Sequence, residues 1–332
     1  MLKKAKKIIR NLSYQDSVSR FEWLFPQEES FSLYKNIFAI KPATWKTAKI
    51  VKGRIESMQE LIHAVGEVGA RMGKYFSDNG NRFNIFRARG AMAWLLRYGY
   101  NQIRNWKARV VCAEGERKNL PMLYNGEELG SAAFRREDIM GSQEKIAADI
   151  AISAFEGEEG FVRKEYEDGT IFAAAYSDAG GLLNLPDMYL MKVIAGPAAR
   201  DAGLSVDKPA KENISLLSAA LNKPPAEIKV TVLDRPQHQK GLKEDLLKAG
   251  ISRENIIWIK DDDLTPVISV MTGKIDMLIG VGGSPEGVLS AVITRAMGGL
   301  MSCRMVPDEA KYSAEITKRR DNWDSFSLRQ EE

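Results

Sequence analysis

The spacing of apolar and polar positions along this chain predicts a succession of amphipathic helices and buried strands. Helical spacing predicts helices over residues 56–76, 91–101, 213–221, 241–248 and 267–271. Short apolar runs between turn residues predict strands over residues 108–112, 146–152, 171–176, 190–194, 228–233, 256–259 and 275–281. From residue 209 onwards strands and helices alternate, which favours an α/β second domain with a largely parallel sheet.

The segment from residue 275 to 307, IDMLIGVGGSPEGVLSAVITRAMGGLMSCRMVP, combines a strand, a glycine turn and a helix. Gly282 and Gly283 permit close approach of a ligand to the backbone. Ser284 is suited to cap the helix, Pro285 to open it, and Glu286 falls in its first turn. This pattern predicts an anion site at a helix N-terminus with a carboxylate available to a metal ion. An ordinary turn, in which Glu286 only balances the helix dipole, explains the same residues.

Three further blocks accompany GGSPEGVLSAVITRAMGG at residues 282–299: AEGERKNLPMLYNGEELG, ADIAISAFEGEEG and LNLPDMYLMKVIAGP, at residues 113–130, 148–160 and 183–197. LDRPQH and IKDDDL, at residues 233–238 and 259–264, are weaker echoes. In this order the blocks resemble the class II fructose-1,6-bisphosphatases, which include the cyanobacterial fructose/sedoheptulose bisphosphatases. The resemblance covers about residues 58–307. It implies the layered αβαβα sugar-phosphatase fold of the lithium-sensitive phosphomonoesterases, with a shortened C-terminal α/β part.

The resemblance also implies hydrolysis of a sugar phosphate with divalent cations held by carboxylates from several loops. Glu114, Glu156 and Glu286 occupy the family's metal positions, and Glu116 beside the first is a candidate catalytic residue. Sugar and phosphate contacts are implied for Gly157, Tyr189, Lys192, Arg235, Asp261, Asp263 and Gly283. An active form would use Mg²⁺ or Mn²⁺, whereas an inactive form would need no cofactor.

Several positions depart from the family pattern in ways that weaken a metal site. The family's DPIEGT loop reads SAFEGE here, so Ser153 replaces a ligating aspartate and Glu158 replaces a threonine. Arg89 stands at the aspartate of the family's ADG triplet, and a guanidinium repels a cation. Lys118 and Asn119 replace an acidic pair. In principle Glu158 can substitute for a lost carboxylate.

These departures leave three functions open. The first is a catalytically silent or weak family member that binds a sugar phosphate, where Arg89 and Lys118 would suit the phosphate group. The second is an active Mg²⁺- or Mn²⁺-dependent fructose-1,6-bisphosphatase of gluconeogenesis or carbon fixation. The third is a scaffold subunit in a larger complex.

Length, composition and charge indicate the class of protein and the cellular compartment. The chain of 332 residues is long enough for two packed domains, and its 44% hydrophobic and 28% charged residues are typical of soluble globular proteins. A net charge of +4 does not indicate a nucleic-acid partner, and no apolar run has the length of a membrane span. Two cysteines exclude a disulfide framework and suit a reducing compartment, the cytoplasm or an organelle stroma.

The pattern divides the chain into four parts. These are an aromatic-rich extension at residues 1–55, a phosphatase-like α+β domain at 56–208, an α/β domain at 209–307 and a polar tail at 308–332. Because large aromatic side chains favour buried surfaces and interfaces, we expect the extension to dock on the body of the protein or on a partner chain. The resemblance makes a homo-oligomer the default.

Overall fold

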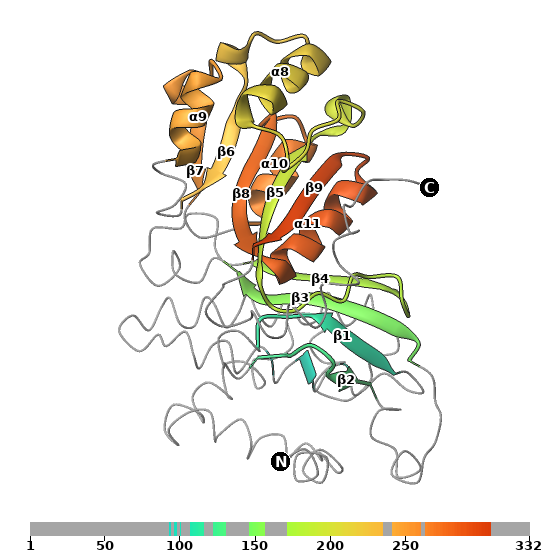
Figure 1. The fold of residues 1–332 in the computed structure, drawn as a ribbon. Helices are drawn as coiled ribbons and strands as arrows, with labels where there is room; N and C mark the ends of the chain where they lie inside the picture. The colour runs from blue at the N-terminus through green and yellow to red at the C-terminus, as the bar shows by residue number, and fades with distance from the viewer. Residues whose placement is uncertain are drawn as a thin grey trace, which may run out of the picture. The chain divides into compact units, whose positions relative to one another are not determined.

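The computed structural model describes residues 107–115, 122–130, 146–156, 171–234, 241–259 and 263–306, together with residues 93, 96, 97 and 100 (Figure 1). The extension at residues 1–55, the predicted helix at 56–76 and the tail at 308–332 lie outside these residues. The chain divides into two compact units, residues 1–184 and residues 185–332. None of the helices in the described part is long and apolar enough to cross a lipid bilayer.

The described part of the first unit contains a four-stranded sheet (Figure 1). Its strands, in the order β2-β1-β3-β4, are β2 (Glu128–Leu129), β1 (Ala108–Cys112), β3 (Ala148–Glu156) and β4 (Ile171–Asp178). β1 and β3 are parallel, and the outer strands are antiparallel to their neighbours. The predicted strand at 108–112 is confirmed, whereas β2 was not predicted because two residues carry no periodicity.

The predicted helix at 91–101 is confirmed at the four positions that the structure describes, residues 93, 96, 97 and 100. This helix contacts the sheet through Tyr100, whose hydroxyl shares a hydrogen bond with that of Tyr176 in β4. Burial raises the pKa of Tyr100 well above its ordinary value, so both phenols stay neutral and act as packing groups.

The second unit contains a five-stranded mixed sheet in the order β7-β6-β8-β5-β9. The strands are β7 (Ile256–Ile259), β6 (Val230–Leu233), β8 (Met277–Gly283), β5 (Tyr189–Ala195) and β9 (Leu300–Val306). β6 is parallel to β7 and β8, but β5 is antiparallel to both β8 and β9. The α/β class is confirmed, and so is the largely parallel sheet, since β6, β7 and β8 are parallel and only β5 of the five strands runs against the strands on either side of it.

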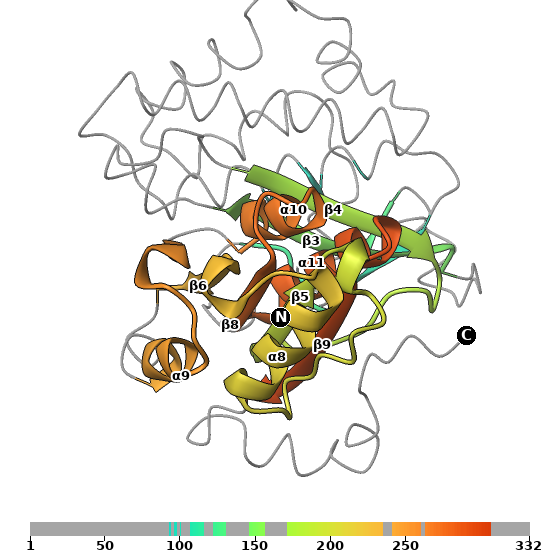
Figure 2. The same cartoon turned by 90° about the horizontal axis from the view of Figure 1, so that it is seen from above.

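Helices cover both faces of this sheet (Figures 1 and 2). On one face α8 (Ala210–Leu221) and α9 (Lys243–Lys248) form a core with Val193, Val230 and Ile279 of the strands. On the other face α10 (Thr265–Met271) and α11 (Ser284–Ala296) pack against Ile194 and Leu278. Successive strand residues point to opposite faces, so Val193 and Ile194 serve different cores. Three-residue turns complete the unit: η4 (Pro197–Ala199), η5 (Pro225–Glu227) and η7 (Arg253–Asn255).

β5 belongs to the second unit along its whole length. Tyr189 lies opposite Gly283 and Val306, and Ala195 at the other end lies opposite Met277 and Leu300. The division after residue 184 therefore keeps β5 with β8 and β9, whereas the sequence analysis assigns β5 to the first domain by placing the boundary near residue 209. Strand–helix alternation does not reveal that an earlier strand enters a later sheet.

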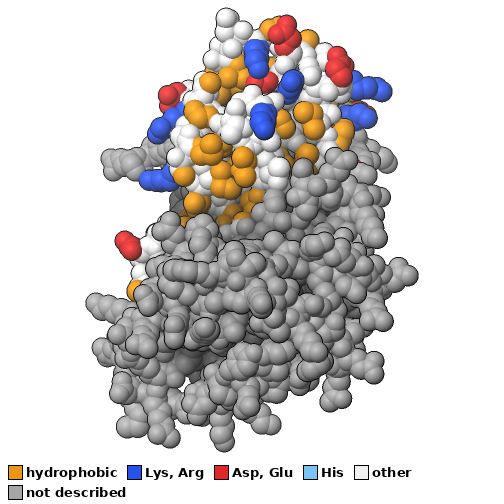
Figure 3. Space-filling model, turned by 180° about the vertical axis from the view of Figure 1, so that it is seen from behind, with side chains coloured by type: hydrophobic (Ala, Val, Ile, Leu, Met, Phe, Trp, Pro, Cys, Tyr) orange, Lys and Arg blue, Asp and Glu red, His pale blue; other side chains and the backbone are white. Residues whose placement is uncertain are grey.

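The described surface of the second unit carries charges of both signs among apolar side chains on the face that Figure 3 shows. Ile268 on α10 and Met297 after α11 are the most exposed large hydrophobic residues among the described residues of this unit, apart from Tyr189. No single-sign patch stands out on the part of this face that is described.

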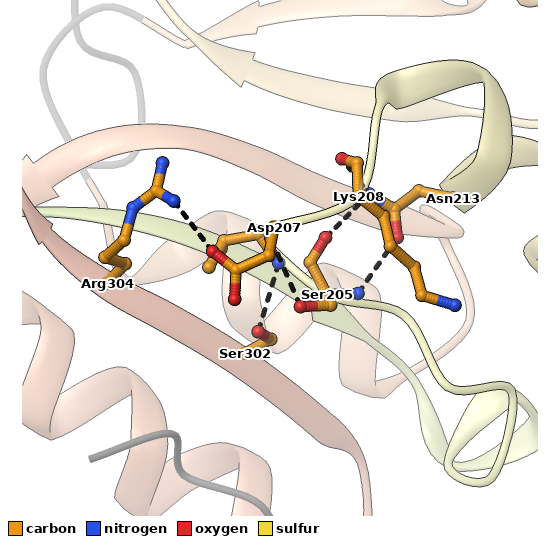
Figure 4. A network of polar contacts seen from close by, with 7 residues as sticks. Ser205, Asp207, Lys208, Asn213, Ser302 and Arg304 are labelled. Atoms are coloured by element: carbon orange, nitrogen blue, oxygen red, sulfur yellow. Dashed lines mark hydrogen bonds and ion pairs between the residues drawn. The ribbon is translucent and has the colours of Figure 1, made fainter. Parts of the chain in front are cut away.

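A loop at residues 205–208, shortly before α8, forms hydrogen bonds both with α8 and with the edge strand β9 (Figure 4). The buried Asn213 side chain accepts a hydrogen bond from the Ser205 amide at 2.9 Å and donates to the carbonyls of Ser205 and Lys208 at 2.8 and 3.1 Å. The Val206 amide donates to the Ser302 hydroxyl at 3.1 Å. Asn213 thus supplies the partners that an irregular backbone segment needs.

Replacing Asn213 by alanine should lower the free energy of unfolding by about 2–3 kcal/mol, because three backbone groups lose their partner in a buried position. The matched control is Asp207→Ala, which removes the exposed 2.7 Å ion pair to Arg304 and should change stability by less than about 0.5 kcal/mol. Urea denaturation measures both. Equal losses for the two variants would show that Asn213 has no special role in the loop.

Candidate active-site edge

One edge of the five-stranded sheet collects the carboxyl ends of the parallel strands β6, β7 and β8. Because β5 runs the other way, its first residue Tyr189 lies at the same edge, opposite Gly283. Tyr189 is 42% exposed there, while its neighbours along the strand are buried or half-buried. Open α/β sheets bind ligands outside the carboxyl ends of their strands, so this edge is the candidate ligand site of the second unit.

Lys192 and Asp263 form a buried ion pair beneath this edge. Lys192 Nζ lies 3.0 Å from Asp263 Oδ2, and the two side chains are 0% and 3% exposed. Lys192 lies in the middle of β5, opposite Gly280 of β8. Asp263 lies in the segment that leads into α10. A lysine buried this deeply is stable only with a partner, since the desolvation of one isolated charge costs several kcal/mol.

Gly282 provides the space in which this pair forms. A Cβ at this position would lie 1.7 Å from Asp263 Oδ2 and 3.0 Å from Lys192 Nζ. Gly280, two residues earlier, lies on the same face of β8 and directly opposite Lys192. The sequence pattern predicts a turn at Gly282, but in the structure the missing side chain of Gly282 leaves room for a buried carboxylate.

Ser284 joins the start of β5 to the start of α11. Its hydroxyl donates to the Pro186 carbonyl at 2.7 Å and accepts from the Met188 amide at 3.0 Å, and its own amide donates to the Met188 carbonyl at 2.7 Å. The N-cap of α11 is Gly283, without a side-chain cap. The prediction of Ser284 as the cap is therefore wrong, because the adjacent β5 segment offers this hydroxyl backbone partners of its own.

Glu286 is buried in the first turn of α11, with 3% of its surface exposed. The helix lies close to β5, since a Cβ on Gly287 would come 2.4 Å from Leu190 Cδ1. A carboxylate at a helix N-terminus is favoured by the helix dipole. Both readings of the sequence pattern, a metal ligand and a dipole partner, are compatible with this position.

Glu114 follows β1 in the first unit and is 5% exposed. Two backbone contacts fix the turn around it: the Ala113 amide donates to Asn125 Oδ1 at 2.8 Å, and the Gly115 amide donates to the Leu123 carbonyl at 3.0 Å. A Cβ on Gly115 would lie 2.4 Å from that carbonyl oxygen, so the close approach requires glycine. The turn at 122–127 thus holds the backbone on either side of Glu114.

A salt bridge that the sequence analysis missed supports this turn. Arg97 Nε and Nη2 lie 2.5 and 3.0 Å from the two carboxylate oxygens of Glu127, and Nη2 also donates to the Met122 carbonyl at 2.8 Å. The Tyr124 amide donates to the same carboxylate at 3.3 Å. The sequence offers two separate signals, the acidic NGEE segment at residues 125–128 and an arginine on the predicted helix at 91–101. Neither signal indicates that the two residues pair.

Ser153 lies in β3, 1% exposed and opposite Ala173 of β4. Glu156 ends the same strand, after a register irregularity. Eight predicted site or departure residues lie outside the described residues: Arg89, Glu116, Lys118, Asn119, Gly157, Glu158, Arg235 and Asp261. Glu114 and Glu156 belong to one unit and Glu286 to the other, so their convergence on one cleft stays a prediction.

Comparison with known proteins decides the family. The chain matches the family model described as bacterial fructose-1,6-bisphosphatase, glpX-encoded, over residues 59–327. It belongs to this family. The D-fructose 1,6-bisphosphatase class 2/sedoheptulose 1,7-bisphosphatase of Synechocystis sp. is 37% identical over 228 residues, which are 67% of this chain and 62% of that protein. Fructose-1,6-bisphosphatase 1 class 2 of Escherichia coli K12 is 34% identical over 223 residues, 66% of this chain and 60% of that protein.

The match spans about three fifths of the length of these glpX-type relatives. The resemblance that the sequence motifs indicated is confirmed, and it extends beyond residue 307, where the motifs end. The family name alone does not transfer an activity to this chain, because catalysis depends on the residues at the site rather than on the fold.

A divalent cation is the cofactor that the glpX family implies, and the described donors do not fit a complete centre for it. No three Asp, Glu, His or Cys side chains gather into a metal site within the described ranges. Ser153 offers a neutral hydroxyl where the resemblance implies a charged ligand, and hard cations prefer several carboxylate oxygens. Glu114 and Glu286 are the two described carboxylates at the implied metal positions.

Cys303 lies beside the buried ion pair, opposite Lys192 across β5 and β9. Burial raises the pKa of the Cys303 thiol from 9.0 to about 11, although the nearby Lys192 cation lowers it in part. The thiol is therefore neutral at physiological pH, and its reactivity reports on the charge beside it.

Gly282→Ala should destabilise the protein by about 3 kcal/mol or more, because the new Cβ occupies the position of the Asp263 carboxylate and separates a buried ion pair. The control is Gly241→Ala, two residues before α9, where a Cβ meets nothing within 4 Å. That change should be neutral or stabilise by up to about 1 kcal/mol. Denaturant unfolding of the two variants measures the difference, and a Gly282→Ala protein as stable as the control would refute the packing.

Cys303 should be alkylated slowly by iodoacetamide at pH 8, in a Cys112→Ala background that leaves it as the only cysteine. With a pKa of about 11 in place of 9.0, the thiolate fraction at pH 8 falls about 100-fold, and the rate should rise until pH approaches 11. Lys192→Met should slow alkylation further at a given pH, since the cation that favours the thiolate is lost. A rate that levels off near pH 9 would contradict the assigned environment.

Proposed function

We propose that this protein binds a phosphorylated sugar of the fructose 1,6-bisphosphate class at the carboxyl edge of its five-stranded sheet, and that it hydrolyses the phosphate ester weakly or not at all. The proposal rests on a contrast between the sheet edge of the second unit and the implied metal position in β3. The second unit keeps a built edge, with the Lys192–Asp263 pair beneath the glycine turn, whereas the buried β3 position that the resemblance assigns to a metal-ligating aspartate holds Ser153.

The residues of the edge have separate tasks in this proposal. Tyr189 presents an exposed phenol for a sugar or phosphate oxygen. Gly283 lets a ligand approach the backbone, and the first turn of the 13-residue helix α11 directs amide groups toward an anion. Apart from the edge, and outside the described residues, the sequence offers Arg89 and Lys118, cations that suit a phosphate group in place of a metal ion.

Buried Glu286 favours a second candidate, an active Mg²⁺- or Mn²⁺-dependent fructose-1,6-bisphosphatase. A carboxylate in the first turn of α11 repels a phosphate dianion at the same helix terminus unless a cation lies between them. Glu114, also buried, and Glu156 would be further ligands of that cation. The cation would polarise the phosphoryl group and supply a deprotonated water.

The scaffold function and the homo-oligomer stay predictions. The aromatic-rich extension on which the scaffold function depends lies outside the described residues. Measuring oligomer size for the full chain and for a chain without residues 1–50 tests both.

The activity test uses purified full-length protein, fructose 1,6-bisphosphate, and Mg²⁺ or Mn²⁺ in turn. The wild type should bind the sugar phosphate in calorimetry and release phosphate at a barely measurable rate. Reverting Arg89→Asp together with Ser153→Asp should raise phosphate release by about 100-fold or more, because it restores two anionic groups to the implied metal site.

Adding Glu114→Gln to the reverted protein is the control and should return the rate to the wild-type level, since it removes an implied metal ligand. Rapid turnover by the wild type would establish the second candidate instead. Absence of any binding of fructose 1,6-bisphosphate to the wild type would overturn the proposal.

A further inference from the structure

We propose that Lys192 is a positioning residue that holds Asp263, and through it the β8–α11 turn and the entry to α10, without touching the ligand itself. This inference deepens the proposed function, because it concerns how the same edge is held ready for a sugar phosphate. It replaces the sugar or phosphate contact that the family resemblance implies for Lys192.

The burial of Lys192 separates it from any ligand at the edge. Its side chain is 0% exposed, and it lies three residues inside β5 from the exposed Tyr189. The strand neighbours on its face are Leu190, which packs on Gly287 of α11, and Ile194, which packs in the core under α10 and α11. A lysine in this position points between the sheet and its helices rather than toward the solvent.

The geometry around Lys192 directs its charge to one partner. The 3.0 Å contact to Asp263 Oδ2 is the hydrogen bond of its ammonium group among the described residues. Gly280 and Gly282 leave the facing strand without side chains at the two positions nearest to the pair. An apolar residue at Gly282 would fill the place of the carboxylate, so the sequence GVGG of β8 and the pair require each other.

Asp263 transmits this constraint to two segments that border the edge. It lies two residues before α10, and its carboxylate contacts Gly282 in the last residues of β8. Gly283 and α11 follow directly, and Ser284 links them to residues 186–188 ahead of Tyr189. One buried contact therefore fixes the backbone of the turn, the α10 entry and the start of β5.

Hydrogen–deuterium exchange on full-length protein tests the positioning role. Lys192→Met should accelerate amide exchange in residues 264–265 and 282–284 by about tenfold or more, and leave α8 unchanged. Gly282→Ala, which displaces the Asp263 carboxylate without altering Lys192, should give the same pattern and provides a second variant if Lys192→Met folds poorly. Unchanged exchange at both segments in these variants would overturn the inference.

The matched control is Lys223→Met in the same unit. It removes another lysine–aspartate contact, 2.7 Å between Lys223 Nζ and Asp276 Oδ1, but Lys223 is 41% exposed and Asp276 keeps the Lys229 amide at 2.9 Å. Exchange at residues 264–265 and 282–284 should match that of the wild type. Acceleration there would mean that any lost ion pair loosens the unit, which also overturns the inference.

A double-mutant cycle on ligand affinity distinguishes positioning from contact. Lys192→Met and Asp263→Asn should each weaken binding of fructose 1,6-bisphosphate about tenfold, and the double variant should be no weaker than the poorer single variant, because both act through one pair. Independent effects that multiply to about 100-fold would assign Lys192 a ligand contact of its own. If the wild type binds no fructose 1,6-bisphosphate, the proposed function fails and the exchange experiment alone decides the role of Lys192.

Discussion

The buried contact between Lys192 and Asp263 sets the conditions under which the second unit can fold. Two charges removed from water are tolerated only when each lies within hydrogen-bonding distance of the other, here 3.0 Å. That requirement holds the segment before α10 against the sheet next to Lys192 in the middle of β5. It also requires glycine at position 282. A hydrophobic pair of similar volume would satisfy packing alone, so the charges point to a role in placing the edge.

Close packing of α11 on β5 complements this contact. Gly287 brings the helix onto Leu190, and Glu286 beside it is buried at the helix start. Ser284 then uses its hydroxyl and amide to close the gap to residues 186–188. The exposed Tyr189 therefore lies on a strand whose start is held by three hydrogen bonds, which would suit the ligand contact proposed for its phenol.

Local patterns predicted much of the fold because strands and helices are local structures. The strands at 108–112 and 256–259 were predicted with their observed bounds, and most other elements within a few residues. What failed depends on contacts between distant segments. The antiparallel insertion of β5 and the partner of Ser284 involve residues far apart in sequence, and Lys192 and Asp263 are 71 positions apart. β9 was missed although Met301, Cys303 and Met305 alternate with Ser302 and Arg304, the period of a half-buried strand; the two polar residues contact the loop at 205–208.

Two positions of the candidate site differ in how strictly the fold constrains their side chains. Ser153 continues the pairing of β3 with β4 opposite Ala173, because strand pairing uses backbone groups and accepts either a hydroxyl or a carboxylate. The sheet therefore does not oppose a change that removes a negative charge from the implied metal position. At Gly282 the opposite holds, since any side chain collides with Asp263. The fold thus constrains the candidate edge strictly and the strand with the implied metal position loosely, so a change at that position leaves the pairing of the strand intact.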